Sequence, residues 1–287
     1  MRVVLSRKGF DSVAGRGASP IMGDGRMVSM PIPEWQTTAA PDGPTFEDTM
    51  VPGTEPTTYA ELGRRCRLRA ATGPAHVDPD LVPGARPRLE GWRASLGQAD
   101  AAAGHLRNQN VGPGDLFLFF GLYAPLGPRG LRRHDWFHAL FGYLQIAEVL
   151  DLHAQPSIPD WLSDHPHLSA GAMATYRPNL LYVSRERLDF APDQPGWGVF
   201  NYQPDLRLTP AGATTRTELE LPACFGPDAG TTVSYLPGHL WSDIGGERVR
   251  VEFRGNKQEM VCSGSEATAD WARELVMATP RWAPAST

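Results

Sequence analysis

The longest apolar stretches of the chain predict a buried hairpin near its middle. Residues 116–123 are almost all aliphatic or aromatic and follow a Gly-Pro-Gly turn, which is typical of a buried strand. Residues 137–152 form a second long apolar segment, whose spacing fits a helix about as well as a strand. Because Gly142 and Tyr143 lie within this segment and the first strand needs a partner, we interpret it as a strand. The two segments would form an antiparallel hairpin with a long loop.

Shorter amphipathic and apolar segments predict the remaining elements. Helices are expected over residues 59–71, with Thr58 as the cap, over residues 94–109 and over residues 265–277. Strands are expected at residues 2–6, 27–32, 179–184, within 197–209, and at 231–236, 247–254 and 258–262. Residues 37–58 are rich in Thr, Pro, Gly and Asp, which predicts an exposed loop. The pattern favours one α+β domain over residues 1–287, with a mixed, mostly antiparallel sheet and a few packed helices.

Composition and charge narrow the class of protein. A formal net charge of -5 argues against broad electrostatic capture of nucleic acid, so a bound nucleotide would need a pocket. Lys8 and Lys257 are the only lysines among 27 basic residues, and this arginine bias is explained most simply by GC-rich coding. The three cysteines form no C-x-x-C pair, which indicates a reducing cytoplasm and no thiolate zinc site. No segment approaches the roughly 18 apolar residues of a membrane span, so we expect a soluble cytoplasmic protein.

Several motifs of the first half of the chain resemble one family. They are LSRKGFDS at residues 5–12, SPI at 19–21, DG at 24–25, S-x-PIP at 29–33, H-x-DPDL at 76–81, G-Q-x-x-AA-x-x-HL at 97–106, DLFLFFG at 115–121 and GYLQI at 142–146. Together they resemble the nucleotide-modification-associated domain family that is third in its numbered series. The resemblance implies a link to enzymes that build modified nucleobases, without fixing a reaction. The partners it implies are a nucleotide or a modified base, possibly within DNA, and other enzymes of a modification system.

A second, local resemblance concerns the centre of the chain. The order of a helix, a strand that begins with Gly-Asp and a strand containing GYLQIAEV resembles the central unit of PUA-like barrels of the EVE and ASCH type. This resemblance implies a partial barrel beside a pocket for a nucleobase.

The end of the first expected strand carries the first candidate site. Ser6, Arg7, Lys8 and Asp11 place two cations and a carboxylate where a strand opens into a loop. Arginine offers a bidentate fork and lysine a point charge, so the cluster suits a phosphate or a carboxylate. We regard Arg7, Lys8 and Asp11 as candidate catalytic residues and Ser6 as a substrate ligand. The alternative is a set of surface salt bridges around a turn.

His76-Val77-Asp78 is the second candidate site. An imidazole and a carboxylate two residues apart on a strand face the same metal, and H-x-D with a distant histidine is the ligand pattern of iron-dependent oxygenases. Asp78 is therefore a candidate both as a metal ligand and as a catalytic residue. The alternative is a turn at Asp78-Pro79-Asp80 beside a half-exposed histidine.

The third metal ligand stays open in the sequence. His138 is the candidate we retain, and the other choices are His105, His134, His165 and His167. Joint binding by His165 and His167 is disfavoured, because Pro166 would fix an extended backbone that sends the two rings to opposite sides. Iron or another divalent metal is the cofactor that this site would take.

Substrate-binding candidates complete the list. Gln98 and His105 lie seven residues apart on one face of an expected helix and offer donors and acceptors to the edge of a base. Asp115 and Tyr143 belong to the two central strands of the resemblance. Near the C-terminus, Arg254, Lys257, Gln258 and Glu259 form a polar group that is either the rim of a site or a solvated turn.

Three functional hypotheses remain at this point. The chain either binds a nucleobase or nucleotide in a polar cleft, acts as a metal-dependent oxygenase, or serves as a non-catalytic partner in a DNA-modification system. Whether it is an enzyme is left open. Walker, Rossmann, nucleophile-elbow and H-E-x-x-H motifs are absent from the sequence, which removes the commonest ATPase, dehydrogenase and hydrolase interpretations.

Overall fold

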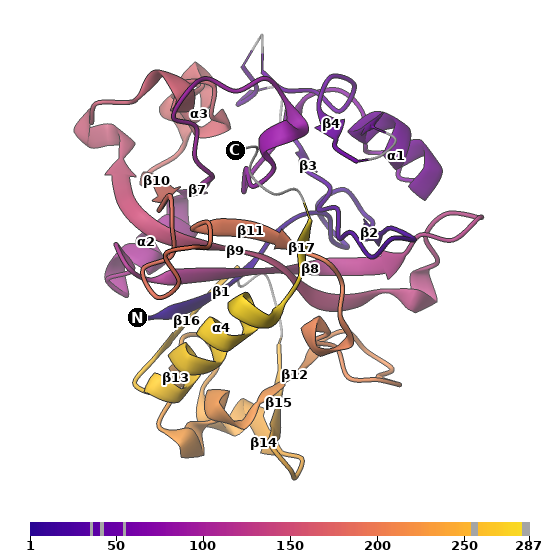
Figure 1. The fold of residues 1–287 in the computed structure, drawn as a ribbon, viewed down its shortest axis with the longest axis vertical. Coiled ribbons are helices and arrows are strands. Elements are labelled where there is room, and N and C mark those ends of the chain that lie inside the picture. Colours follow the sequence, from indigo (N-terminus) through magenta and orange to yellow (C-terminus); the bar gives the residue numbers. More distant parts are fainter. Residues whose placement is uncertain (35–36, 41–42, 54–55, 254–257, 283–287) are drawn as a thin grey trace.

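The computed structural model describes residues 1–34, 37–40, 43–53, 56–253 and 258–282. A hairpin of β8 (Leu116–Pro125) and β9 (Phe137–Asp151) forms its centre, paired antiparallel from Leu116 opposite Gln145 to Tyr123 opposite Phe137. The register shifts between Phe119 and Phe120, where the hairpin has a bulge. This pair crosses the middle of the molecule in Figure 1 and confirms the predicted hairpin.

Two short strands pair in parallel with β8, on the edge of β8 that is opposite β9. β1 (Val3–Arg7) lies beside residues 116–120, and β2 (Ser19–Ile21) lies beside residues 123–125. Tyr123 pairs with β9 on one side and with Ser19 on the other, so β1 and β2 occupy the same edge. Residues 8–18 leave the sheet between these two strands, and we call them the excursion loop. Loops of this kind can carry polar side chains over a rigid scaffold.

The remaining strands extend this sheet on both sides. In the described residues its order is β13-β16-β1-β8-β9-β10-β7, with β11 paired to β9 and β17 to β11. These strands are β7 (Ser95–Ala99), β10 (Asn179–Ser184), β11 (Trp197–Phe200), β13 (Thr232–Val233), β16 (Glu259–Ser263) and β17 (Arg281–Trp282). The outermost strands β13 and β7 do not pair with each other, so no closed barrel is present in the described part of the chain. The prediction of an α+β fold with a mixed, mostly antiparallel sheet is confirmed.

Small sheets and helices pack around the large sheet. The small sheets comprise β12 (Glu218–Pro222), β14 (Trp241–Asp243) and β15 (Arg248–Glu252), then β3 (Ile32–Pro33) with β6 (Ala75–His76), and β4 (Met50–Val51) with β5 (Thr57–Thr58). The helices are α1 (Tyr59–Cys66), α2 (Asp100–Asn108), α3 (Ala170–Thr175) and α4 (Glu266–Ala278). Single 3-10 turns are η1 (Pro83–Ala85), η2 (Arg133–Asp135), η3 (Leu152–Ala154), η4 (Asp160–Leu162), η5 (Pro166–Leu168), η6 (Pro204–Leu206), η7 (Ala223–Phe225), η8 (Pro227–Ala229) and η9 (Gly238–Leu240). Figure 1 shows α4 below the central strands and α1 and α3 above them.

Local sequence signals explain several of these boundaries. Thr58 caps α1 as predicted, because its side chain accepts from the Glu61 amide while the Glu61 carboxylate accepts from the Thr58 amide. The helix expected over residues 94–109 is wrong in its first part, since residues 95–99 form β7 and pair with β10. Asp100 has a φ of 51°, which separates this strand from α2.

Two further expectations need correction. Of the strand expected at residues 27–32, only Met27, in a bridge to Ile21, and Ile32, the first residue of β3, are paired. In residues 37–58, expected to be an exposed loop, Phe46 and Thr49 are fully buried and two short strands are present. An aromatic residue within a polar stretch can anchor it to the core, which composition alone does not reveal.

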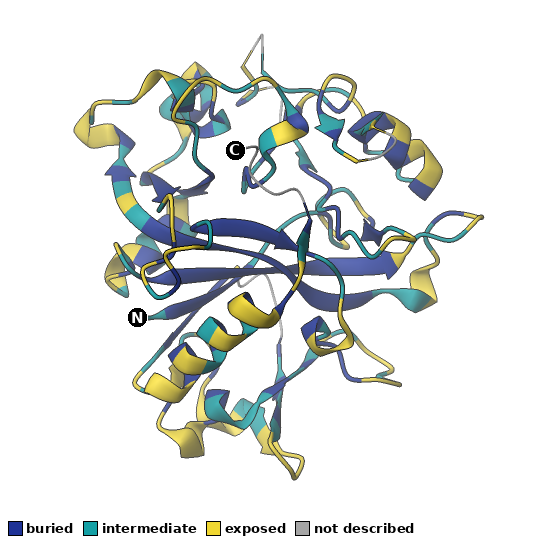
Figure 2. Ribbon diagram, in the orientation of Figure 1, coloured by how far each residue is buried: buried dark blue, intermediate teal, exposed yellow. Residues whose placement is uncertain are grey.

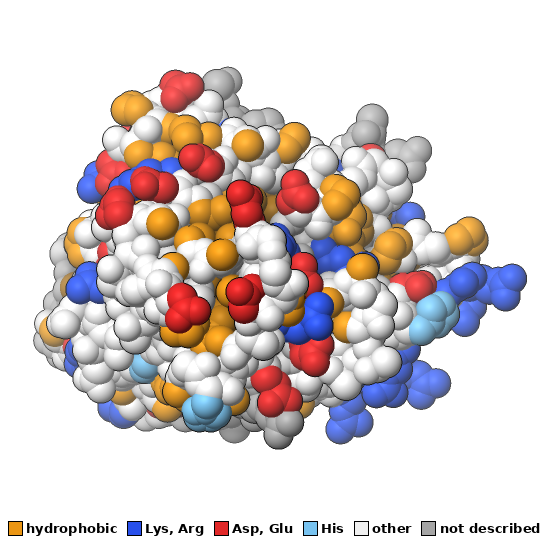
Figure 3. All heavy atoms as spheres, turned by 90° about the horizontal axis from the view of Figure 1, so that it is seen from below, with side chains coloured by type: hydrophobic (Ala, Val, Ile, Leu, Met, Phe, Trp, Pro, Cys, Tyr) orange, Lys and Arg blue, Asp and Glu red, His pale blue; other side chains and the backbone are white. Residues whose placement is uncertain are grey.

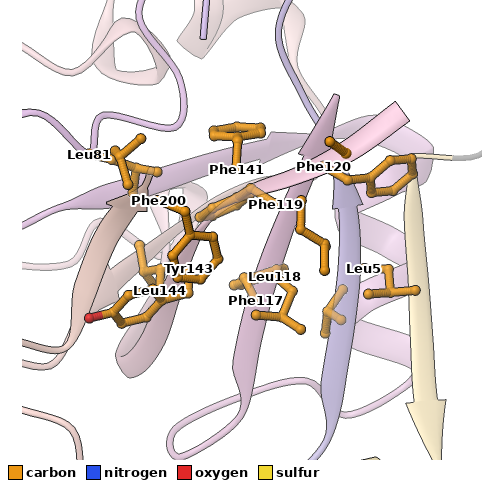
Figure 4. Close-up of a cluster of buried hydrophobic side chains, with 14 of the residues drawn as sticks. Leu5, Leu81, Phe117, Leu118, Phe119, Phe120, Phe141, Tyr143, Leu144 and Phe200 are labelled. Carbon is orange, nitrogen blue, oxygen red and sulfur yellow. The ribbon is translucent and has the colours of Figure 1, made fainter. Parts of the chain in front are cut away.

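Aromatic side chains of the central hairpin form the core. Figure 4 shows Phe117, Phe119, Phe120, Phe141 and Tyr143 on these strands, and all are almost completely buried. Burial of one such side chain contributes about 1.5–3 kcal/mol relative to exposure. The dark strands in Figure 2 show that the hairpin is buried along most of its length. These aromatic residues therefore form the scaffold of the site and are not exposed for stacking on a base.

Candidate functional site

A cavity of about 640 Å³ opens beside the point where the excursion loop leaves β1. Its walls come from β1 and this loop, from the segment after β6, from β7 and the start of α2, from η5 and from β16. The polar and aromatic side chains that line it are Arg7, Lys8, Asp11, His76, Asp78, Gln98, Asp100, His167, Tyr176, Tyr235, Gln258 and Glu259. Cavities of this size bind small molecules in many proteins.

Three buried side chains converge at one end of the cavity. His76 Nε2 and His167 Nε2 each lie 3.6 Å from Asp78 Oδ2. The candidate donor atoms of these residues all lie within 4.8 Å of one another, which is a spacing that a single metal ion can bridge. We call His76, Asp78 and His167 the His-Asp-His group.

The second nitrogen of each histidine ring has a fixed partner. His76 Nδ1 hydrogen-bonds to a carboxylate oxygen of Glu34, and His167 Nδ1 donates to Asn179 Oδ1 at 2.6 Å. Asn179 Nδ2 donates to the His167 carbonyl at 2.9 Å, which fixes the orientation of the amide. Because carboxylate and amide oxygens accept, both Nδ1 atoms carry hydrogen. Metal-binding histidines in proteins are held in this way, with Nε2 directed at the ion.

Asp78 is held on its other side by donors. Its Oδ1 accepts from the Gly97 amide at 2.8 Å and lies 3.7 Å from His165 Nε2. His165 Nδ1 accepts from the His167 amide, so hydrogen is carried by Nε2, which faces Asp78. Burial raises the pKa of Asp78, but the ring nitrogens of His165 and His76 that face its carboxylate outweigh burial and hold the pKa well below its usual range. Asp78 is therefore ionised.

The two histidines of the group differ in protonation. Burial lowers the pKa of His167 to about 3, against the opposing charge of Asp78, so this ring is neutral and ready to donate a lone pair. Burial also lowers the pKa of His76, but hydrogen bonds to Asp78 and Glu34 outweigh it and raise the pKa to about 9. At neutral pH a proton thus lies on His76 where a metal ion would bind, and the ion would displace it.

The structure corrects the prediction for the third ligand. His138 does not line the cavity, since its ring packs against Phe120 and Phe253 at centroid distances of 5.9 and 6.5 Å. Burial lowers the pKa of His138 to about 4. His167, one of the other choices in the sequence, lies beside His76 and Asp78 instead. Pro166 begins the turn of η5 instead of an extended segment, so the rings of His165 and His167 lie 5.5 Å apart beside Asp78.

A second polar cluster surrounds Glu259 in the same cavity. Glu259 Oε1 accepts from Lys8 Nζ at 2.6 Å, from Ser6 Oγ at 3.0 Å and from Gln98 Nε2 at 2.5 Å. Burial raises the pKa of Glu259, and the Lys8 charge opposes this effect. Within the described residues, Glu259 Oε2 is buried without a hydrogen-bond partner. We call Ser6, Lys8, Gln98 and Glu259 the Glu259 cluster.

Strand β7 connects the two groups. The Gly97 amide donates to Asp78, and the side chain of the next residue, Gln98, donates to Glu259. A Cβ at position 97 would lie 2.3 Å from the His167 ring, so glycine is required for this close approach. The His-Asp-His group and the Glu259 cluster are therefore neighbouring parts of one site.

Arg7 and Asp11 lie at the border of this site. Their side chains form an ion pair of 3.5 Å, and Arg7 also lies over the Phe253 ring at 5.6 Å. Asp11 Oδ1 accepts from the amides of Val13 and Ala14, both at 2.6 Å. Asp11 thus shapes the excursion loop in addition to lining the cavity.

Four of the five expected substrate ligands lie outside the cavity lining, and one of them is Ser6, which is buried against Glu259. Asp115 accepts from the Arg2 amide at 2.6 Å and the Gly112 amide at 3.1 Å, which fixes the start of β8. Tyr143 is a core residue whose hydroxyl donates to the Pro195 carbonyl and accepts from Arg281. His105 bonds to Ser234 and stacks on Tyr235 at 4.1 Å, so it supports a residue that does line the cavity.

Five site residues were not among the sequence candidates, and one of them is Asp100, which lines the cavity. Glu34 follows the PIP motif and Asn179 begins β10, and each orients a histidine ring. Tyr176 and Tyr235 line the cavity. Gln258 and Glu259 belong to the polar group noted near the C-terminus, whereas its members Arg254 and Lys257 lie outside the described residues.

Comparison with known proteins places the chain in a family. No helix of the described residues is long and apolar enough to cross a membrane. No curated protein and no solved structure shows significant similarity to the chain. The sequence profile of one family, described as nucleotide modification associated domain 3, matches residues 2–263. This range includes every residue of the His-Asp-His group and of the Glu259 cluster. The chain therefore belongs to the nucleotide modification associated domain 3 family.

Proposed function

We propose that this chain is a metal-dependent enzyme that modifies a nucleobase or nucleotide bound in the cavity. The observation that carries the proposal is the orientation of two buried imidazoles. Each has Nδ1 bound to an oxygen acceptor and Nε2 directed at the same carboxylate oxygen. The lone pair of His167 and the negative charge of Asp78 thus meet at a point where His76 carries a proton that a metal ion can replace.

The type of ligand favours iron among the divalent metals. Two histidines and one carboxylate on one side of an ion leave further coordination positions open, and this set is characteristic of non-haem iron(II) enzymes. Zinc also accepts two histidines and a carboxylate, so it is the main competitor. An iron ion bound by His76, Asp78 and His167 would supply oxidative chemistry at the end of the cavity. Oxidation of a base carbon is a reaction of this kind.

The rest of the cavity suits a nucleobase or nucleotide. Its volume of about 640 Å³ is within the usual range for such ligands. Gln98 and Glu259 offer hydrogen-bonding groups for the edge of a base, and Tyr176 and Tyr235 offer aromatic faces. Arg7 and Lys8 line the cavity and offer positive charge to a phosphate. The family context supports this class of substrate.

Metal stoichiometry tests the proposal directly. Protein purified without a His tag is loaded with ferrous ion under anaerobic conditions, desalted, and analysed for metal by mass spectrometry. We expect one iron per chain in the wild type and in His138→Ala, which removes a buried histidine outside the cavity. His167→Ala should lose the metal while keeping its circular dichroism spectrum. Equal loss in both variants, or no stoichiometric metal in the wild type, would contradict the proposal.

Recognition of a nucleotide without catalysis is the second candidate. The observation that favours it is that the bonds of the Glu259 cluster need no metal. Calorimetric titration of chelator-treated protein with nucleoside monophosphates tests it. Binding that is unaffected by metal, together with an absence of stoichiometric metal in the first experiment, would favour this candidate over the enzyme.

A further inference from the structure

Exposed arginines are concentrated in three segments, although the net charge of the chain is -5. The segments are the end of α1 with the following turn, the connection between β8 and β9, and the excursion loop. The exposed arginines in them are Arg16, Arg64, Arg65, Arg67, Arg69, Arg129, Arg132 and Arg133, which we call the arginine patch. A coding bias explains why these residues are arginine and not lysine, but it does not explain why they are gathered together.

Contacts between the three segments make the patch continuous. The Leu131 amide donates to the Cys66 carbonyl at 3.5 Å, and a Cβ at Gly130 would lie 3.1 Å from both Arg65 O and Arg67 Cγ. A Cβ at Gly17 would lie 2.2 Å from Leu68 Cδ2, so the excursion loop packs on the end of α1. In Figure 3, Lys and Arg side chains gather along the right-hand edge, the side on which α1 and the β8–β9 connection lie in Figure 1.

Among the described residues, most of this positive charge has no acidic partner. In the described part of the chain, the ion pair made by the patch joins Arg64 and Glu61 at 3.9 Å, and both side chains are exposed. Arg133 lies over the Trp136 ring at 5.9 Å. Asp135 is 3.3 Å from His134. Clustered cations that lack acidic partners repel one another, so the patch is suited to a polyanion.

The excursion loop joins the patch to the cavity. Gly9, Asp11 and Ala14 of this loop line the cavity, while Arg16 belongs to the patch. A strand whose phosphates lie on the patch would thus have a base within reach of the cavity. Phosphate contacts of this kind position a nucleic acid without reading its sequence.

We propose that the arginine patch binds the sugar-phosphate backbone of a single-stranded nucleic acid, one base of which enters the cavity. We infer a single-stranded substrate because the site is deep: His167 and Glu259 in its walls are almost completely buried. A base within a duplex would first have to leave its stack to reach them, whereas a base in a single strand is free to enter. This inference rests on the proposed function and specifies its substrate as a polymer.

The salt dependence of binding tests the inference. Anisotropy of a fluorescein-labelled 20-nucleotide single-stranded DNA is measured with chelator-treated protein between 50 and 300 mM NaCl. Two double variants, Arg129→Gln with Arg132→Gln and Arg67→Gln with Arg69→Gln, remove charge from separate segments. The matched control is Arg107→Gln with Arg187→Gln, which removes two exposed arginines of α2 and of the β10–β11 connection.

The expected effect follows from counterion release. Each phosphate contact contributes about 0.7 to the slope of log affinity against log salt for a single strand, so each patch variant should lower the slope by about 1.4. The corresponding loss of affinity is about 25-fold at 0.1 M salt, while the control should match the wild type within about twofold. Equal slopes in patch and control variants would overturn the inference. The inference would also be overturned if a nucleoside monophosphate competed as effectively as unlabelled strand at equal phosphate concentration. Tighter binding of duplex than of single strand would overturn it as well.

Because the strand-binding assay uses metal-free protein, its result can be separated from that of the metal experiment for the proposed function. Loss of stoichiometric metal binding with retained patch-dependent strand binding would contradict the enzyme and leave the docking surface intact. The opposite result would leave a metal enzyme that acts on a free nucleotide. RNA of the same length is compared in parallel, since both backbones carry the phosphate that the patch recognises.

Discussion

Asn179 gives the sharpest test of the His-Asp-His group, because it touches the group without being a ligand. Its Oδ1 accepts from His167 Nδ1 at 2.6 Å, and its Nδ2 donates to the His167 carbonyl at 2.9 Å. Asn179→Leu keeps the approximate volume and removes both bonds. A buried donor and a buried acceptor then lack partners, which costs about 1–3 kcal/mol each. We expect the free energy of unfolding of the metal-free protein to fall by about 2–6 kcal/mol.

The effect on metal binding is separate and more informative. Without Asn179, the His167 ring can rotate or exchange its tautomer, and loss of such an outer contact lowers metal affinity about 10- to 100-fold. That loss corresponds to about 1.4–2.7 kcal/mol. Asn179→Asp retains the oxygen acceptor for Nδ1 and should keep more of the affinity than Asn179→Leu.

Gln145→Leu is the matched control for this variant. Gln145 is also a buried amide with two hydrogen bonds, one to the Gly114 carbonyl and one from the Asp189 amide, and it does not line the cavity. Urea unfolding should show a similar loss of stability in both variants. Titration with cobalt(II), followed by its visible absorption, should show weakened binding for Asn179→Leu only. If the two variants bind cobalt with affinities within threefold of each other, the assignment of His167 as a ligand is refuted.

Three other residues give independent tests. Burial lowers the pKa of His138 to about 4, below its value of about 6.5 in the unfolded chain. The unfolded state therefore binds more protons than the folded state between these two values. The stability that is present above pH 6.5 is lost as the pH falls toward 4. Between pH 7 and pH 5 the free energy of unfolding should therefore fall by about 2 kcal/mol more in the wild type than in His138→Leu, as measured with urea. Tyr235→Ala should weaken binding of a nucleoside monophosphate by about 1–3 kcal/mol in calorimetry, whereas Tyr235→Phe should not, and equal losses would exclude stacking. Gly97→Ala should displace the His167 ring and reduce cobalt affinity at least about tenfold. Gly104→Ala, where nothing lies within 4 Å of the new Cβ, should bind cobalt like the wild type.

The central scaffold could be predicted because its signals are local. An unbroken apolar run defines β8, and Thr58 with Glu61 forms a capping box that is readable in the sequence. The start of α2 could not be placed, since residues 95–99 have a composition that suits a helix and only their pairing with β10 makes them a strand. A tertiary contact therefore outweighed local preference at that point.

The site was predictable only where spacing along the chain carries it. His76 and Asp78 are two residues apart, and the structure brings His76 Nε2 within 3.6 Å of Asp78 Oδ2. His167 depends on the turn that begins at Pro166, and Asn179 and Glu34 reach the rings from distant segments. No pattern in the sequence indicates that Glu259 is buried next to Ser6 and not part of a solvated turn.

The distance along the chain between the parts of the site has a consequence for biosynthesis. Ser6 and Glu259 are bonded to each other although 253 positions separate them, and β16 completes the sheet beside β1. During translation, β1 can pair with β8 early, but its antiparallel neighbour β16 is made only after the residues that separate Ser6 from Glu259. Contacts of such long range form slowly and leave strand edges open in the meantime. A nascent or truncated chain that ends before residue 259 thus lacks the wall that β16 gives the cavity, so the site is complete only after this strand has been made.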